Sequence, residues 1–200
     1  MPDLKSPTNN VMKGVALVVN DWQLSGVFTG GSGSPYTVGF SYPGINNQIM
    51  TGSPDYGARV LITGDPGKGC SSDLLRQFNT GAFQGAPVNS NGLESGQNYM
   101  RSCPDHVWDF AVARNIRLGG NRSFQIRAEL FNAFSEVILT DRQTNAQFAS
   151  LQEPTRITNL PFNADGSVNP DRSRPSNAGF GVANNARALR NVQLQVRFSF

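Results

Sequence analysis

The last nine residues of the chain, Val192 to Phe200, alternate strictly between apolar and polar side chains. Every even-numbered position is apolar and every odd-numbered position is polar, which is the pattern of a β-strand with one apolar and one polar face. Nine residues is close to the roughly 9–11 that a tilted strand needs to cross a bilayer. The segment therefore predicts a membrane-spanning strand with lipid on one side and water on the other.

The same parity recurs in three earlier segments, residues 22–29, 108–118 and 124–130, which are predicted as strands. In the first of them the alternation is broken by Val27. A soluble antiparallel sheet can produce each of these strands singly, because it also has one buried and one wet face. Alternation alone therefore leaves two architectures open, a membrane barrel and a soluble β-sandwich.

The connections between these strands are very unequal in length. Two long polar stretches, about residues 41–99 and 141–190, contrast with the short Leu118–Ser123 link, whose Gly-Gly-Asn sequence is typical of a tight hairpin. Compact soluble domains rarely contain structureless loops above about 12–15 residues. Outer-membrane barrels combine long extracellular loops with short periplasmic turns. We therefore expect an all-β, antiparallel transmembrane β-barrel with long extracellular loops, in an outer membrane of the Gram-negative type.

Charge and hydropathy exclude further functional classes and one way of crossing a membrane. The formal net charge is +3, and the basic residues are three lysines and scattered single arginines without a cluster, so we do not expect nucleic-acid binding. No apolar run approaches the roughly 20 residues of a membrane helix, so any crossing must use strands. Residues 1–7 show no secretion signal. Because an outer-membrane protein must first cross the inner membrane, we expect the chain to be a fragment.

Several ordered sequence blocks resemble the late barrel of TonB-dependent receptors. Residues 21–28 and 32–38 are similar to a "W-x-L-S-G-x-x … S-G-x-P-(F/Y)-T" segment of that family, and most closely to its Oar-like group, whose members carry a carboxypeptidase-regulatory-like domain. Further blocks follow in the same order: Gly64–Pro66, Phe78–Phe83, Asp109–Leu118 ("D-x-x-x-x-(K/R)-x-(I/F)-x-L"), Arg127–Phe134 ("R-x-E-x-F-N-x-F") and the terminal Phe200. The resemblance extends from about Trp22 to Phe200.

The resemblance implies that residues 1–200 are the C-terminal portion of a large barrel, its last strands and loops, without a plug domain or an energy-coupling box. By the same resemblance the intact protein is a receptor that binds a ligand outside the cell and imports it by active transport, driven by the TonB energy-coupling complex. The segment itself would be structural and in contact with outer-membrane lipid. Phe200 resembles the C-terminal aromatic read by the barrel-assembly machinery, although an interfacial or core aromatic would have the same sequence.

Two other functional classes remain open at this point. One is a self-contained barrel of about eight strands that serves as a membrane anchor or adhesin, for which the length is adequate. The other is a soluble carbohydrate-binding β-sandwich, which would bury the even-numbered face and protect Trp108, Phe110 and Phe198 from water.

Cys70 and Cys103 are the only cysteines, and both lie in loop-like sequence rich in Gly, Ser and Pro. Their spacing fits no zinc pattern. In an oxidising compartment the pair would form a disulfide worth about 3–4 kcal/mol in the chain-entropy model.

The sequence offers little support for catalysis or for a cofactor. His106 is the only histidine and no nucleophile accompanies it, so we expect no enzymatic activity. Residues 64–69 lack the spacing of a phosphate-binding loop, and residues 163–171 place oxygen ligands around a glycine without the spacing of an EF-hand. We therefore predict no bound metal or cofactor, with residues 163–171 as a weak calcium candidate.

Charged residues at odd positions of the predicted strands would face the barrel interior. We expect these side chains to pair with each other for structural reasons, because buried charges need partners; they are Asp109, Arg117, Arg127, Glu129 and Arg197. Exposed loops often carry function, so the loop aromatics Tyr42, Tyr56 and Phe83 are candidate ligand contacts. No motif identifies the ligand.

Overall fold

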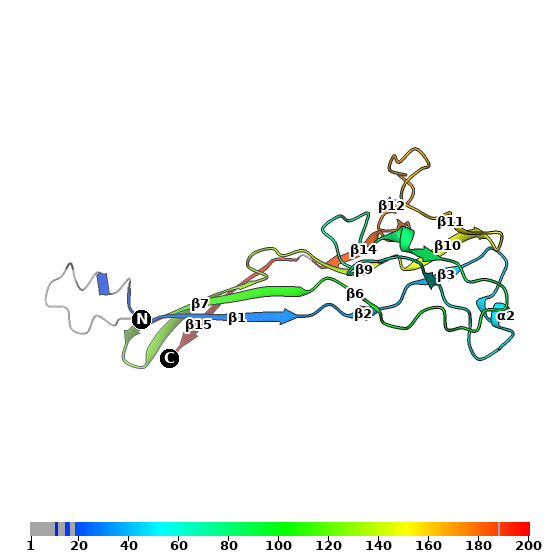
Figure 1. Cartoon of the computed structure of the whole chain (residues 1–200). Helices are drawn as coiled ribbons and strands as arrows, with labels where there is room; N and C mark the ends of the chain where they lie inside the picture. The colour runs from blue at the N-terminus through cyan, green and yellow to red at the C-terminus, as the bar shows by residue number, and fades with distance from the viewer. Residues whose placement is uncertain (1–10, 12–14, 17–18, 188) are drawn as a thin grey trace. The chain divides into compact units, whose positions relative to one another are not determined.

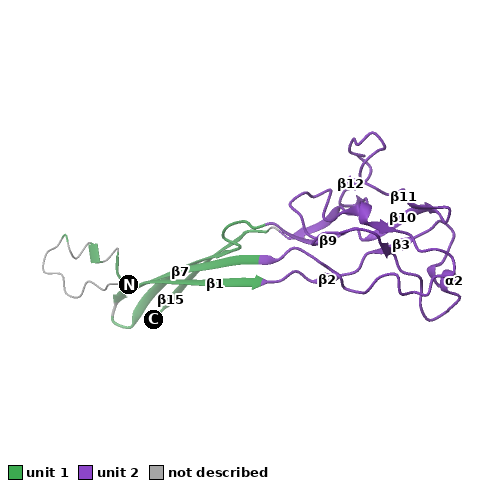
Figure 2. Ribbon diagram, in the orientation of Figure 1, with its two compact units in different colours: residues 1–30, 106–136, 188–200 green, residues 31–105, 137–187 purple. Residues whose placement is uncertain are grey.

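The computed structural model describes residues 11, 15, 16, 19–187 and 189–200. The chain forms two compact units (Figure 2). We call Met1–Gly30, His106–Glu136 and Ala188–Phe200 the sheet unit, and Gly31–Asp105 with Val137–Arg187 the loop unit. No helix in the described ranges is long and apolar enough to cross a membrane.

The sheet unit is built on four long strands (Figure 1). Their order in the sheet is β1-β7-β8-β15, and their bounds are Trp22–Gly31, Asp105–Gly119, Arg122–Phe131 and Asn191–Ser199. β7 and β8 are joined by a two-residue turn at Gly120 and Asn121, in which Gly120 has a φ of 62°. This left-handed conformation favours glycine and confirms the predicted hairpin.

The strand register places side chains of one parity on one face of the sheet. Across β7, β8 and β15 the apolar rows run Phe110–Leu130–Val192, Val112–Ala128–Leu194 and Ile116–Phe124–Phe198. The odd-numbered polar residues of the same strands occupy the opposite face, with Glu129 opposite Gln193 and Arg127 opposite Gln195. One local period of two, repeated in each strand, therefore builds an apolar face and a polar face across the whole sheet.

The apolar face is not covered by other parts of the sheet unit. Leu194 is 77% exposed and Val196 is 63% exposed. Trp108 and Phe198 are also exposed, which contradicts the protection that a soluble sandwich would give them. An exposed apolar face of this extent marks a surface that meets lipid or another apolar partner.

The loop unit contains short strands where the sequence indicated long loops. Its elements are β2 (Pro35–Tyr36), β3 (Gly39–Ser41), α2 (Asn47–Thr51), β4 (Leu61–Ile62), η1 (Thr80–Ala82), β5 (Phe83–Gln84), β6 (Met100–Arg101), β9 (Ile138–Arg142), β10 (Asn145–Ser150), β11 (Glu153–Ile157), β12 (Ser173–Arg174), β13 (Asn177–Ala178) and β14 (Ala183–Arg187). β3 pairs in parallel with β10, so the two long connections share a sheet. Both connections are thus folded and joined to each other.

The loop unit has its own aromatic core. The rings of Phe78, Phe83 and Phe180 meet nearly edge to face at centroid distances of 5.1–5.8 Å. Tyr42 packs against Phe148 in the same core. Tyr42 and Phe83 are 4% and 3% exposed, so their prediction as ligand contacts is wrong, because their apolar rings fill the core.

Candidate functional site

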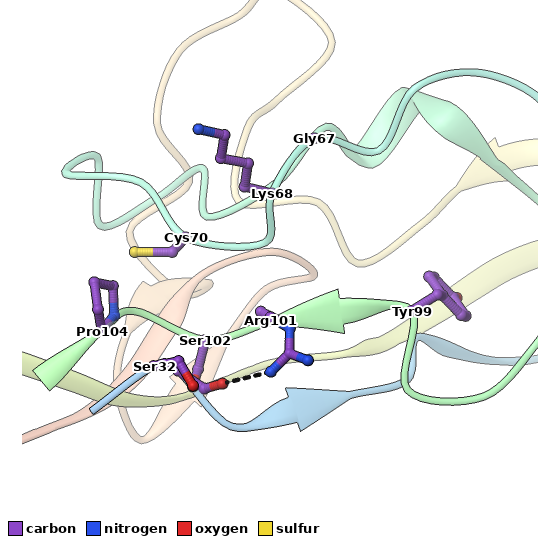
Figure 3. A pocket seen from close by; sticks show the side chains of 9 residues that line it. Ser32, Gly67, Lys68, Cys70, Tyr99, Arg101, Ser102 and Pro104 are labelled. Atoms are coloured by element: carbon purple, nitrogen blue, oxygen red, sulfur yellow. Dashed lines mark hydrogen bonds between the residues drawn. The ribbon is translucent and has the colours of Figure 1, made fainter.

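A cavity of about 580 Å³ in the loop unit has the size of a small-molecule site. Its walls come from the segment before β2, from the Gly67–Cys70 loop and from both sides of β6 (Figure 3). We call this cavity the disulfide pocket, and the side chains that matter most in it are Ser32, Lys68, Cys70, Tyr99, Arg101 and Pro104. Of these residues, only Cys70 was singled out from the sequence, as one half of the expected disulfide, and none of the others was proposed as functional.

The segment before β2 can approach β6 closely because it contains Gly33. A Cβ atom at Gly33 would lie 1.7 Å from the carbonyl oxygen of Ser102, so no other residue fits without a shift of the backbone. Beyond this contact the Ser102 amide donates to the carbonyl of Ser34 over 2.9 Å, and Pro35 then pairs with Arg101. The start of the "S-G-x-P-Y" block, Ser32 and Gly33, therefore forms one wall of the pocket.

The Gly67–Cys70 loop needs glycine at two positions. Gly67 and Gly69 have φ values of 76° and 88°, and a Cβ at Gly69 would lie 2.5 Å from the hydroxyl of Tyr36. The carboxylate of Asp65 accepts a hydrogen bond from the Gly67 amide over 2.8 Å. No helix follows the loop, which agrees with the sequence argument against a phosphate-binding loop of the nucleotide type.

A disulfide ties this loop to the chain just after β6. Cys70 and Cys103 are bonded, 33 residues apart in sequence, with a Cα–Cα distance of 4.9 Å. The bond holds the loop that carries Lys68 against the segment that carries Pro104. Two walls of the pocket are therefore covalently joined.

The buried guanidinium of Arg142 supports the loop from behind. Arg142 is 4% exposed, and its Nη1 and Nη2 donate to the carbonyls of Gly69 and Leu139 over 3.0 and 3.2 Å. Its charge also lies 4.8 Å from the centre of the Tyr36 ring, and the Tyr36 hydroxyl donates to the same Gly69 carbonyl over 2.8 Å. Burial raises the pKa of Tyr36, which opposes the effect of Arg142, so the hydroxyl stays a donor at neutral pH.

The disulfide pocket is positively charged. Lys68 and Arg101 line it, and in the described part of the chain neither has a carboxylate within 4.0 Å. Nη1 of Arg101 donates to the Gly33 carbonyl over 3.3 Å, as drawn in Figure 3, which orients the guanidinium and leaves its other donors available. The Tyr99 hydroxyl donates to the carbonyl of Val38 over 3.2 Å, and burial raises the pKa of Tyr99. The tyrosine is thus neutral and adds no negative charge.

A second cavity of about 350 Å³ in the loop unit has a mixed character. It is lined by hydroxyl residues together with both Asp141 and Arg142. Because a carboxylate and a guanidinium are present together, this cavity has no net preference for an anion or a cation.

The polar face of the sheet unit holds the charges that were predicted to point inward. Nη2 of Arg127 lies 2.6 Å from Oε1 of Glu129. Asp109 accepts a hydrogen bond from the Asn132 amide over 2.8 Å, and Arg117 lies 3.9 Å from Asp21. Four of the five predicted inward charges, Asp109, Arg117, Arg127 and Glu129, thus have a local structural partner.

Arg197 is the fifth of the predicted inward charges and lies on β15 opposite Gln125. No carboxylate of the described residues lies within 4.0 Å of it. The expected pairing of Arg197 with another charge is therefore not seen among the described residues.

The "R-x-E-x-F-N-x-F" block closes the end of β8. Asn132 has a φ of 50°, and its side chain accepts from the Glu136 amide over 2.9 Å and donates to the Glu136 carbonyl over 3.0 Å. Two residues on, the Phe134 ring packs edge to face against Trp108 and Phe110. The block therefore turns the chain and adds an aromatic ring to the apolar face.

Arg114 is a charged residue on the apolar face that the sequence analysis did not single out. Its register partner is Ile126, and its guanidinium lies 5.3 Å from the centre of the Trp22 ring. Its even position in an alternating strand was the available signal, because a charge there must face lipid or find an aromatic partner.

The other residues considered from the sequence are not drawn into a common site. His106 is exposed near the start of β7. In residues 163–171, Asp165 accepts hydrogen bonds from the amide and hydroxyl of Ser167, and the described residues contain no group of three or more metal-ligating side chains. Phe200 follows β15, is 94% exposed and has its ring 6.1 Å from that of Phe198.

Strands of bilayer length that carry an exposed apolar face and a charged opposite face define a β-barrel protein of the outer membrane. The chain belongs to the family described as "Outer membrane beta barrel domain", whose model matches residues 6–193. No curated protein and no solved structure matches the chain. The expected all-β antiparallel barrel fold and the outer-membrane location are thereby confirmed, and the soluble sandwich is left without support.

Proposed function

We propose that residues 1–200 are the C-terminal barrel portion of a TonB-dependent receptor. In the intact protein a ligand would bind on the outside of the cell and be imported by active transport coupled to the TonB complex. The portion described here would supply wall strands and a folded external region, and it would carry out no catalytic step. Support comes from the ordered sequence blocks and from the family match to an outer membrane β-barrel domain.

The observation that carries the proposal is the open sheet. β1 and β15 lie at its two edges, and in the described ranges neither pairs with a further strand on its outer side. Backbone N–H and C=O groups left unpaired in hydrocarbon cost several kcal/mol each, so a sheet in lipid must close. Closed single-chain barrels of bacterial outer membranes have at least about eight strands, whereas four long strands are present here. Further strands of a large receptor barrel would complete the wall, which supports the proposal.

The connectivity supports an external position for the loop unit. The link between β7 and β8 has two residues, whereas residues 31–105 and 137–187 make the other two connections. Outer-membrane barrels place short turns in the periplasm and long loops outside the cell. The disulfide between Cys70 and Cys103 also fits an oxidising exterior.

Phe200 is proposed to act during assembly. Its even position continues the alternation of β15, and its exposed ring leaves it accessible to a binding partner. We expect the barrel-assembly machinery to recognise this end of the chain as it inserts the final strand. Deletion of Phe200 should then reduce the amount of folded protein in the outer membrane more strongly than the stability of the protein once folded.

The native size of the protein tests the receptor assignment. An antibody raised against residues 42–83 should detect, in the outer-membrane fraction of the native cells, a band several times larger than 21.6 kDa. A band at 21.6 kDa in the outer membrane would refute the receptor and indicate that several copies of the chain close a small barrel together. A band in the soluble fraction would contradict the barrel itself.

Transport needs a separate measurement. Ligand uptake by the intact protein should stop in cells that lack the TonB energy-coupling complex, while surface binding of the ligand should persist. Uptake that is unchanged in such cells would indicate a passive channel.

A further inference from the structure

We infer that the disulfide pocket binds a small organic anion, one that carries a carboxylate or phosphate group on a ring-sized apolar body. The inference deepens the proposed function and rests on it, because it names the class of ligand that the receptor would capture outside the cell. The charge of the pocket, the chemistry of its walls and its rigidity support the inference.

Charge decides the sign of the ligand. Lys68 and Arg101 are the ionisable cations that line the pocket, and no acidic residue lines it. The carboxylate nearest in sequence is that of Asp65, which is already engaged by the Gly67 amide over 2.8 Å. Neither cation has a carboxylate of the described residues within 4.0 Å, so an anion in the pocket is attracted by both charges without a competing acidic side chain.

The two cations differ in the contacts they can make. The guanidinium of Arg101 donates one hydrogen bond to the Gly33 carbonyl, and its remaining N–H groups can donate to a planar or tetrahedral anion. The ammonium of Lys68 is a mobile point charge on an exposed side chain. This combination suits one oxyanion held by Arg101 with Lys68 as an adjustable second contact.

The walls and the volume indicate what carries the charge. The Tyr99 ring, the Pro104 ring and the disulfide contribute apolar surface beside the cations. The cavity of about 580 Å³ lies within the range of roughly 300–1,000 Å³ that small-molecule sites occupy. A bare inorganic ion would leave most of this space and the apolar wall unused. An aromatic or cyclic acid uses both the charge and the wall.

The pocket is held in shape before any ligand arrives. The disulfide joins two of its walls, the Gly33 contact fixes the third, and Arg142 clamps the Gly69 carbonyl behind the loop. A preformed site loses less conformational entropy on binding, which favours capture of a dilute ligand.

Binding can be measured on the native protein extracted from outer membranes in detergent. The probes are benzoate and phenyl phosphate, with benzyl alcohol as the uncharged match and inorganic phosphate as the match without a ring. Titration calorimetry or saturation-transfer NMR should detect binding of one or both aromatic anions, with at least about tenfold weaker binding of benzyl alcohol and of inorganic phosphate, since each lacks one of the two recognised features.

Two variants locate the binding. The double variant K68Q/R101Q should weaken binding of the aromatic anion by at least about tenfold, because both charge-assisted contacts are lost. The matched control is R174Q, which removes an exposed arginine of β12 that does not line the pocket and should leave binding unchanged. Retention of the disulfide and of the heat-dependent shift in gel mobility shows that each variant is folded.

Three results would overturn the inference. They are equal binding of benzoate and benzyl alcohol, stronger binding of inorganic phosphate than of phenyl phosphate, and unchanged anion binding by K68Q/R101Q. These outcomes are independent of transport: specific anion binding by a protein whose uptake does not need the TonB complex would refute the proposed function and keep the pocket. Normal TonB-dependent uptake without anion binding would do the reverse.

Discussion

The assignment of the even-numbered face to lipid can be tested by one charged substitution in β15. Leu194 lies one position from Gln195, the midpoint of Asn191–Ser199, so it is about 3 Å from the centre of the strand at a rise of roughly 3.4 Å per residue. An arginine near the bilayer midplane on the lipid face costs about 2–4 kcal/mol. We therefore expect L194R to lower the free energy of unfolding by that amount, or about 30- to 700-fold in the equilibrium constant.

The same substitution has a different expected effect if the face meets water. Leu194 is 77% exposed, and surface substitutions at such positions in soluble proteins usually change stability by no more than about 0.5 kcal/mol. The expected loss of unfolding free energy for L194R is therefore clearly larger if Leu194 faces lipid than if it faces water. The matched control is Q193R, on the opposite face and directly across from Glu129, where a change of less than about 1 kcal/mol is expected.

Urea unfolding of the intact protein in lipid vesicles measures both variants. Trp22 and Trp108 both lie on long strands of the sheet, so the change in fluorescence that is lost when both are replaced by phenylalanine reports on the sheet. A loss for L194R that is no larger than the loss for Q193R would refute the placement of the even-numbered face in lipid.

Three further predictions concern parts outside the apolar face. Replacement of Cys70 or Cys103 by serine should destabilise the loop unit by about 3–4 kcal/mol, because a closed loop of this length restricts the unfolded chain; an unchanged melting temperature would contradict this. N132A should cost about 1–3 kcal/mol in urea unfolding, since it loses two side-chain hydrogen bonds at a left-handed φ, and a neutral effect would show that the turn forms without them. Burial raises the pKa of Glu94, but hydrogen bonds from Ser90 and from backbone amides outweigh it and hold the pKa below its ordinary value; stability is therefore present above that value and is lost as the pH falls through the lowered pKa. Thermal unfolding between pH 7 and 3 should show this acid loss in the wild type and a smaller one in E94Q, and equal profiles would exclude Glu94 as the cause.

The four long strands were predictable because their signal is local. Within each strand, apolar and polar residues alternate. Because Arg127 and Glu129 are both odd-numbered, the sequence already placed them on the same face. The hairpin was also predictable from local sequence, because Gly and Asn residues favour the backbone conformation of a tight turn. Arg114 was missed because a charge at an apolar position finds its partner, Trp22, on another strand.

The fold of the loop unit was not predictable in this way. Its core joins Phe40, Phe78, Phe148 and Phe180, which are separated by long polar segments and follow no period. The parallel pairing of β3 with β10 joins residues about one hundred positions apart, and no local pattern encodes such a contact. The sequence therefore indicated loops where tertiary contacts make a folded unit.

The amino-acid sequence by itself indicated the membrane class of this protein, because alternation gives each strand one apolar and one polar face, and the unequal connections favour a barrel over a soluble sandwich. Only the tertiary structure brings the residues of the candidate binding site together. Lys68 and Arg101 are 33 residues apart, and neither carries a motif. They line one cavity because Gly33 allows a close approach of backbones, a disulfide joins the walls and Arg142 holds the loop. The disulfide was already expected from the two cysteines, whereas the Gly33 and Arg142 contacts depend on distances in space that a sequence pattern does not contain.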